Sequence, residues 1–141
     1  MGRTDWDRRV AGIYSDAHYF YCDEMLRSEF YCDELYDYDV DPRELKIITT
    51  ISSPPYKGAD LILKTAKILS QDMGVRISWS VFGVSELKLA EMMTGIDAES
   101  VGVRASGVVS AQTLKAEILA SDVYVHSSYI ENGCISVSEA R

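Results

Sequence analysis

Long hydrophobic runs are missing from this sequence. No apolar stretch approaches the roughly 20 residues of a membrane-spanning helix. The first seven residues lack the apolar segment of a secretory signal, and Trp6 stands where an N-myristoylation signal places Ser or Thr. These absences predict a cytoplasmic protein without a transmembrane segment, and they leave peripheral contact with a membrane open.

Basic residues are in the minority. The 141 residues include 14 Lys and Arg against 22 Asp and Glu, which gives a formal net charge of -8. Binding to a phosphate backbone gains free energy from counterion release, and that release requires an excess of Lys and Arg. The balance of charge therefore predicts that nucleic acid is not a partner.

Cysteine and histidine are scarce and badly spaced for a metal. The three cysteines are Cys22, Cys32 and Cys134, and the two histidines, His18 and His126, lie far apart in the sequence. An odd number of cysteines without a close pair predicts reduced thiols and no zinc site. Cys134 as a catalytic nucleophile is a weaker alternative, because His126 would have to turn toward it; at the end of a strand, His126 is expected to be a loop or rim residue.

Glycine-rich fingerprints are also absent. The sequence contains no G-x-G-x-x-G, no G-x-x-x-x-G-K-[ST] and no G-x-S-x-G. Without these motifs, the dinucleotide dehydrogenases, the P-loop enzymes and the α/β-hydrolases lose their main support. The missing glycine fingerprint after Ile51 also argues against an epimerase of Rossmann type.

Charge divides the chain into two parts. Residues 1–45 hold 12 of the 22 acidic residues, 5 of the 14 basic residues and six of the nine tyrosines, whereas residues 46–141 are nearly neutral. We interpret 1–45 as an acidic, tyrosine-rich leader or interdomain segment and 46–141 as a partial Rossmann-like domain. In the leader, Thr4 and Asp7 resemble a capping box for a helix to about residue 11. Residues 19–21 favour an extended piece, 23–31 a helix and 33–44 a linker.

The second part alternates between two hydrophobic periods. Short β-branched runs predict strands at 45–51, 75–82, 101–105 and 122–127. Helical spacing between them predicts helices at 59–71, 85–93, 110–119 and 133–141, with Ser85 as the cap of the second. Such alternation predicts an α/β fold, namely a Rossmann-like parallel sheet with helices on both faces.

In an open parallel sheet, ligands bind outside the carboxyl ends of the strands. The predicted strand ends lead into residues 54–58, Gly83, Gly107 and residues 127–136, so we expect a site to be drawn from these loops. Lys57 precedes Gly58 at a helix start, where a lysine is useful if an anion binds there. The plainer alternative is a solvated lysine after a turn.

Two glutamates in the last loop point to hydroxyl groups. Glu131 and Glu139 flank a turn at Gly133, whose backbone N–H groups could hold a phosphate. A carboxylate beside an anion site is costly unless it accepts hydrogen bonds, and sugar and ribose hydroxyls donate them. The pattern suggests a nucleotide joined to a sugar. Alternatively, Ser136 and Glu139 form an ordinary capping box.

Residues 47–139 resemble the C-terminal, nucleotide-sugar-binding domain of the GT-B glycosyltransferases of group 1 (family 4), in truncated form. The resemblance is carried by Lys57-Gly58, by Gly83, by Gly107-Val108 and by the block from Asp122 through Ser127 and Glu131 to Glu139-Ala140. It implies a transferase that moves a sugar from a nucleoside-diphosphate sugar to an acceptor with retention, without metal or other cofactor.

The resemblance also implies a role for each matching residue. Lys57 contacts the donor diphosphate and Glu131 the sugar hydroxyls, as the catalytic pair. Gly58 lies beside them, while Gly83, Gly107 and Val108 border the nucleotide. The backbone N–H groups of Gly133, Cys134, Ile135 and Ser136 face sugar or phosphates, and Glu139 holds the ribose.

The sequence departs from the family in two respects. Ser52 stands where the family has an arginine that also binds the diphosphate, so one of two cations is missing. The sequence stops at Arg141, two residues past Glu139, where the family continues with further helices and strands. The acceptor-binding domain that precedes this half in the family is also absent, and we expect the isolated chain to be inactive. The alternative is a non-enzymatic, flavodoxin-like or receiver-like binding module, which would be marked by an acidic pocket drawn from separate strand ends.

Overall fold

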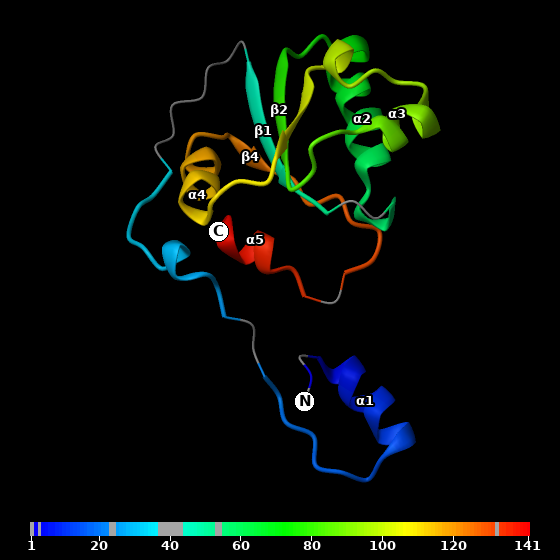
Figure 1. Cartoon of the computed structure of the whole chain (residues 1–141), viewed down its shortest axis with the longest axis vertical. Helices are drawn as coiled ribbons and strands as arrows, with labels where there is room; N and C mark the ends of the chain where they lie inside the picture. Colours follow the sequence, from blue (N-terminus) through cyan, green and yellow to red (C-terminus); the bar gives the residue numbers. More distant parts are fainter. Residues whose placement is uncertain (1, 3, 23–24, 37–43, 53–54, 132) are drawn as a thin grey trace.

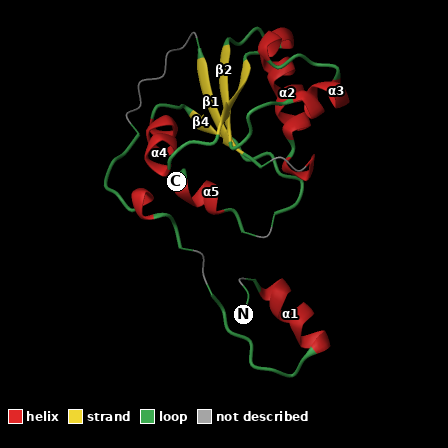
Figure 2. Cartoon of the chain, in the orientation of Figure 1, coloured by secondary structure: helices red, strands yellow, loops and turns green. Residues whose placement is uncertain are grey.

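The computed structural model describes residues 2, 4–22, 25–36, 44–52, 55–131 and 133–141. Four strands form one parallel sheet in the order β3-β2-β1-β4. Their bounds are β1 Leu45–Thr50, β2 Ile77–Phe82, β3 Val103–Gly107 and β4 Val123–Tyr124. With helices between the strands, this is the Rossmann-like α/β fold that the sequence predicts (Figure 1, Figure 2).

Helices cover both faces of the sheet. On one face, α2 (Ala59–Lys67) and α3 (Lys88–Thr94) pack over a core that includes Trp79 and Val81. On the other face, α4 (Ala111–Leu119) packs through Leu114 against Ile48 and Phe82. The two helix layers lie on opposite sides of the strands (Figure 1). Because both faces of the sheet are covered, three successive residues of the inner strand β1 are buried: Ile47, Ile48 and Thr49.

Helix boundaries differ from the sequence prediction where packing decides them. The helix predicted at 59–71 is α-helical only to Lys67, and a π-helical turn, Ile68–Asp72, continues it. Gly74, with φ +69°, follows two residues later. Helix α3 begins at Lys88 with Leu87 in the cap position, so the prediction of Ser85 as N-cap is wrong. Leu87 is buried in the core, and this packing places the helix start three residues later.

All four strands differ from their predicted bounds: β1 ends one residue earlier, at Thr50, and β2 begins two residues later, at Ile77. The last helix, predicted at 133–141, covers only Ile135–Glu139. β3 begins at Val103, because Glu99–Val101 forms a 3-10 turn that ends at Gly102. β4 is only two residues long, although Val125 still donates its backbone N–H to the Ile48 carbonyl at 2.9 Å. The chain then leaves the sheet toward the loop that follows β1.

The leader contains two separate pieces. Thr4 and Asp7 form the predicted capping box, and α1 runs over Asp5–Tyr14, three residues beyond the predicted end. It buries no residue and lies apart from the sheet (Figure 1). Residues 28–30 form a 3-10 turn, so the helix predicted at 23–31 is wrong over its described part. Residues 23–24, and 37–43 of the expected linker, lie outside the described residues.

The second piece of the leader packs against the sheet domain. Phe30 joins the core cluster on the α4 side. Glu34 forms an ion pair with Lys115 of α4 at 2.6 Å, and the Tyr36 hydroxyl donates to Asp122 at 2.8 Å. Residues 25–36 are thereby held beside α4 and the final helix, α5 (Ile135–Glu139). Among the described residues, no helix is long and apolar enough to cross a membrane.

Candidate functional site

Loops from the carboxyl ends of the strands meet at a cavity of about 300 Å³, here called the strand-end cavity. Arg27, Ser52 and His126 line this cavity. Six of the residues predicted to bind a donor line it as well, namely Lys57, Gly83, Val108, Glu131, Ser136 and Glu139. Arg27 comes from the leader, and the other residues come from the loops after β1, β2, β3 and β4 and from α5. A second cavity beside α5, of about 380 Å³, shares several of the same residues and adds Gly133, Cys134 and Ile135.

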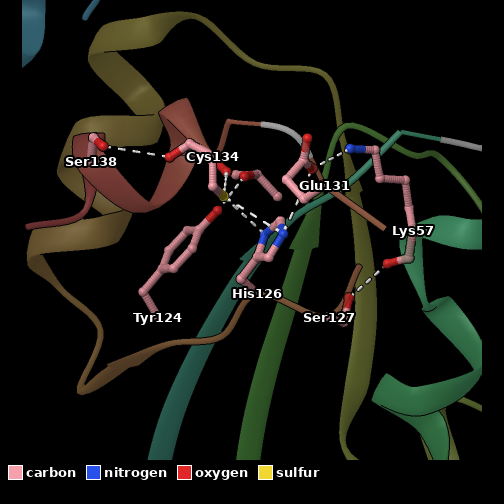
Figure 3. A network of polar contacts seen from close by, with 9 residues as sticks. Lys57, Tyr124, His126, Ser127, Glu131, Cys134 and Ser138 are labelled. Carbon is pink, nitrogen blue, oxygen red and sulfur yellow. Dashed lines mark hydrogen bonds and ion pairs between the residues drawn. The ribbon is translucent and has the colours of Figure 1, made fainter. Parts of the chain in front are cut away.

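Lys57 and Glu131 form an ion pair in this cavity. The distance from Lys57 Nζ to Glu131 Oε2 is 2.7 Å, although the two residues are 74 positions apart (Figure 3). Their side chains are 20% and 28% exposed, so the pair is largely shielded from water. The hydrogen bond to Glu131 raises the pKa of Lys57 above its usual value, and partial burial opposes this rise. The ammonium therefore stays charged, and it has three N–H donors of which Glu131 uses one.

Gly58 joins the loop after β1 to the loop after β4. Its φ of +75° lies in the left-handed region, and a Cβ at this position would come 2.0 Å from the Ser127 carbonyl oxygen. The Ser127 hydroxyl donates to the Lys57 carbonyl at 2.8 Å, which holds the same two segments together (Figure 3). Glycine is required here, because any side chain would separate Lys57 from the segment that carries Glu131.

A second set of contacts anchors the same segment. The Tyr129 backbone N–H donates to the Tyr56 carbonyl at 2.8 Å, and the Tyr129 hydroxyl donates to Asp60 at 2.8 Å. Lys64 donates to the same carboxylate. The hydrogen bond from Lys64 lowers the pKa of Asp60 most, and the hydrogen bond from Tyr129 lowers it further. Burial of the carboxyl raises the pKa, but the net result lies below the usual range. The segment after β4 is thus fixed to the start of α2 just before Glu131.

Gly83, after β2, and Val108, after β3, line another part of the strand-end cavity, whereas the predicted Gly107 is the last residue of β3 and is not in its lining. Gly83 has φ +92°, and a Cβ there would come 2.1 Å from the Ile51 carbonyl oxygen, so the backbones after β1 and β2 approach closely. Gly83 donates to the Gly107 carbonyl at 2.8 Å. Val108 follows and is largely exposed. Gly83 and Val108 also border a larger, mostly apolar cavity of about 550 Å³ between the ends of α2 and α3.

Glu139 is paired in the structure with a residue that the sequence analysis did not identify. Arg27 donates through Nε and Nη2 to the two carboxylate oxygens of Glu139, at 2.7 Å each. The side chain of Glu139 is only 4% exposed. The N-cap of α5 is Cys134 without a side-chain cap, so the alternative of a capping box from Ser136 to Glu139 is wrong. Arg27 lines the strand-end cavity, in which Ser52 occupies the predicted arginine position.

His126 lies in the loop after β4 and lines the strand-end cavity, as expected of a loop or rim residue, and it also turns toward the Cys134 thiol. Cys134 Sγ lies 3.2 Å from Nδ1 and 3.6 Å from Nε2 of His126 (Figure 3). His126 Nε2 in turn lies 3.7 Å from Glu131 Oε2. Cysteine and histidine form no close pair in the sequence, which predicts no metal site, yet the fold brings ligand atoms of His126, Glu131 and Cys134 within 4.8 Å of one another.

No protein-family model matches this chain, and no curated protein matches its sequence.

Proposed function

We propose that this chain is the donor-binding part of a glycosyltransferase that moves a sugar, with retention, from a nucleoside-diphosphate sugar to an acceptor. The observation that carries the proposal is the Lys57–Glu131 ion pair inside the strand-end cavity. It combines an anion-binding group with a hydroxyl-binding group at the edge where open parallel sheets bind ligands.

The chemistry depends on negative charge that develops on the leaving diphosphate. Lys57 is charged and has N–H groups available beyond the one that it donates to Glu131. A fixed cation in a partly shielded cavity stabilises that charge more than water does. In this proposal no metal is needed, because Lys57 and the backbone N–H groups of residues 133–136 supply the electrostatic stabilisation.

The two glutamates bind hydroxyl groups in this proposal. Glu131 accepts hydrogen bonds from the donor sugar, and its carboxylate tolerates the nearby diphosphate because Lys57 neutralises it. Glu139 accepts from the ribose. The bidentate contact with Arg27 fixes the plane of the Glu139 carboxylate and leaves other N–H groups of the guanidinium for a second ligand.

The acceptor is expected to bind to a separate domain that completes the cleft. We therefore propose donor binding, but no turnover, for this chain alone. A non-enzymatic binding module would use acidic groups from separate strand ends. In the described part of the strand-end cavity the acidic residues are Glu131 and Glu139, both from the segment after β4 and both ion-paired.

Amide NMR shifts on titration with UDP- and GDP-sugars test the proposal. Binding predicts shifts at Lys57, Gly58 and residues 133–136. Lys57→Met should weaken binding by about 10- to 100-fold, which corresponds to one hydrogen bond to a charged group. Lys67→Met is the matched control, because Lys67 is exposed on α2 and outside both cavities.

Two results would contradict the proposal. One is the absence of shifts near Lys57 and Glu131 at millimolar donor. The other is an equal loss of affinity in Lys57→Met and Lys67→Met, because this would indicate nonspecific attraction of the anionic ligand.

A further inference from the structure

His126, Glu131 and Cys134 bring one nitrogen, one oxygen and one sulfur ligand to a common point. Measured from His126 Nε2, the distances are 3.6 Å to Cys134 Sγ and 3.7 Å to Glu131 Oε2. Zinc ligands lie about 2.0–2.3 Å from the metal, so the edges of a tetrahedral site measure about 3.3–3.8 Å. Both of these distances fall in that range, and all three ligand atoms lie within 4.8 Å of one another.

We propose that His126, Glu131 and Cys134 form a binding site for a thiophilic divalent cation, with zinc as the best fit. Thiolate and imidazole favour zinc over magnesium or calcium, which prefer oxygen ligands alone. Three protein ligands leave the fourth tetrahedral position for water. Ser136 Oγ, 3.4 Å from Cys134 Sγ, is close enough to donate a hydrogen bond to the thiolate.

The backbone between His126 and Glu131 is held in place before a cation binds. All three lie on the nine-residue segment 126–134 that follows β4, and Cys134 is the N-cap residue of α5. This segment is anchored between the ligands by the hydrogen bonds of Ser127 to Lys57 and of Tyr129 to Tyr56. A site held in this way loses little conformational freedom when the cation binds.

Lys57 is the main charge that opposes the site. Its ammonium lies 2.7 Å from Glu131 Oε2, the oxygen that faces His126. Arg27 and Glu139 line the adjoining cavity and neutralise each other through their bidentate contact. A cation at the cluster therefore competes with Lys57 for Glu131, and removal of the lysine charge should tighten metal binding.

Cobalt is a spectroscopic probe for the test, because it occupies tetrahedral zinc sites and absorbs light. We expect the full chain, kept reduced, to bind one Co²⁺ with strong d–d absorption and a sulfur-to-cobalt charge-transfer band, both removed by Zn²⁺. Cys134→Ser should abolish the charge-transfer band. His126→Asn should weaken Zn²⁺ binding by more than the roughly 10- to 100-fold cost of losing an outer-sphere partner.

The chain supplies matched controls. Cys32→Ser and His18→Asn remove an exposed cysteine and the other histidine and should leave cobalt binding unchanged. Lys57→Met should raise the affinity for Zn²⁺. In the unmodified chain, bound Zn²⁺ should also slow alkylation of Cys134, but not of Cys32, as measured by mass spectrometry of the peptides.

Three outcomes would overturn the proposal: no tetrahedral cobalt spectrum, the same charge-transfer band in Cys134→Ser as in the unmodified chain, or an equal loss of affinity in His18→Asn and His126→Asn. Rapid alkylation of Cys134 that Zn²⁺ does not slow would also overturn it and would indicate a reactive Cys–His pair instead. The measurements need no nucleotide, so this proposal and the proposed donor binding can fail independently.

Discussion

Arg27 and Glu139 are joined by two hydrogen bonds of 2.7 Å each across 112 positions of the sequence. Glu139 is almost fully covered, whereas the Arg27 side chain is 45% exposed. Arg27 also stacks over the ring of Phe30, with its central carbon 4.9 Å from the ring centroid. The leader thus provides the charge partner of a carboxylate in the strand-end cavity.

Arg27→Ala should lower the free energy of unfolding, because it leaves the covered Glu139 carboxylate without a cation. We expect a loss of about 1–2 kcal/mol, below the roughly 3–5 kcal/mol of a fully buried pair, because Arg27 is partly exposed to solvent. Urea unfolding measures the change. The control is Arg9→Ala, since Arg9 is 77% exposed and lies 4.0 Å from Asp5. Equal losses in the two variants would contradict the assigned role of Arg27.

The buried hydrogen bond between Trp79 and Thr49 gives a second prediction. Trp79 Nε1 donates to Thr49 Oγ1 at 2.9 Å, and both side chains are buried in the sheet. Thr49→Val keeps the shape but leaves the indole N–H without its acceptor, which should cost about 1–3 kcal/mol. Thr65→Val, on the exposed side of α2, should cost much less in the same unfolding experiment. A change in Trp79 fluorescence should accompany only the first substitution.

Gly58 and Gly95 have similar left-handed backbone conformations, but only at Gly58 would a side chain collide with a neighbouring backbone. Comparing their alanine variants therefore measures the cost of the left-handed backbone apart from the cost of the collision. Gly95 has φ +67° with open space where the methyl group of an alanine would lie, so Gly95→Ala should cost only the roughly 1–2 kcal/mol of a left-handed residue. Gly58→Ala adds a clash with the Ser127 backbone and should cost more. It should also weaken the proposed binding of a nucleotide-sugar, because the loop that carries Lys57 must shift. Similar stabilities of the two variants would contradict the tight approach at Gly58.

Asp60 should contribute to the loss of stability in acid. Its pKa in the folded chain is lowered by the hydrogen bonds from Lys64 and Tyr129, against the opposing effect of burial. A carboxyl with a lowered folded pKa stabilises the fold above its unfolded pKa of about 3.9, and this contribution disappears as the pH falls through the lower folded value. Asp60→Asn should therefore unfold with a shallower pH dependence below about pH 4. Urea titrations at several pH values measure this slope, and an unchanged slope would contradict the prediction.

Much of the fold follows from local sequence patterns. The β-branched run of β1 and the apolar spacing of α2 predict both elements, and the parallel order then places all strand ends at one edge. That rule is enough to expect residues from the loops after β1 and β4 to meet. The 2.7 Å contact of Lys57 with Glu131 agrees with this expectation.

Other parts of the site depend on contacts that no local pattern encodes. Arg27 reaches Glu139 because Phe30 and Glu34 fix the leader against the α4 side, and nothing near Arg27 in the sequence signals this. The contact of His126 with Cys134 depends on the path of the segment after β4. That path is set by the bond from Ser127 to Lys57, which lies 70 positions away.

The short β4 bears on how the protein behaves at high concentration. Because β4 pairs with β1 over only two residues, its outer edge offers an incoming strand few places to extend the ladder. On the far side, the exposed Arg104 puts a charge in β3. Aggregation by addition of a strand to the sheet is therefore disfavoured at both edge strands, β3 and β4.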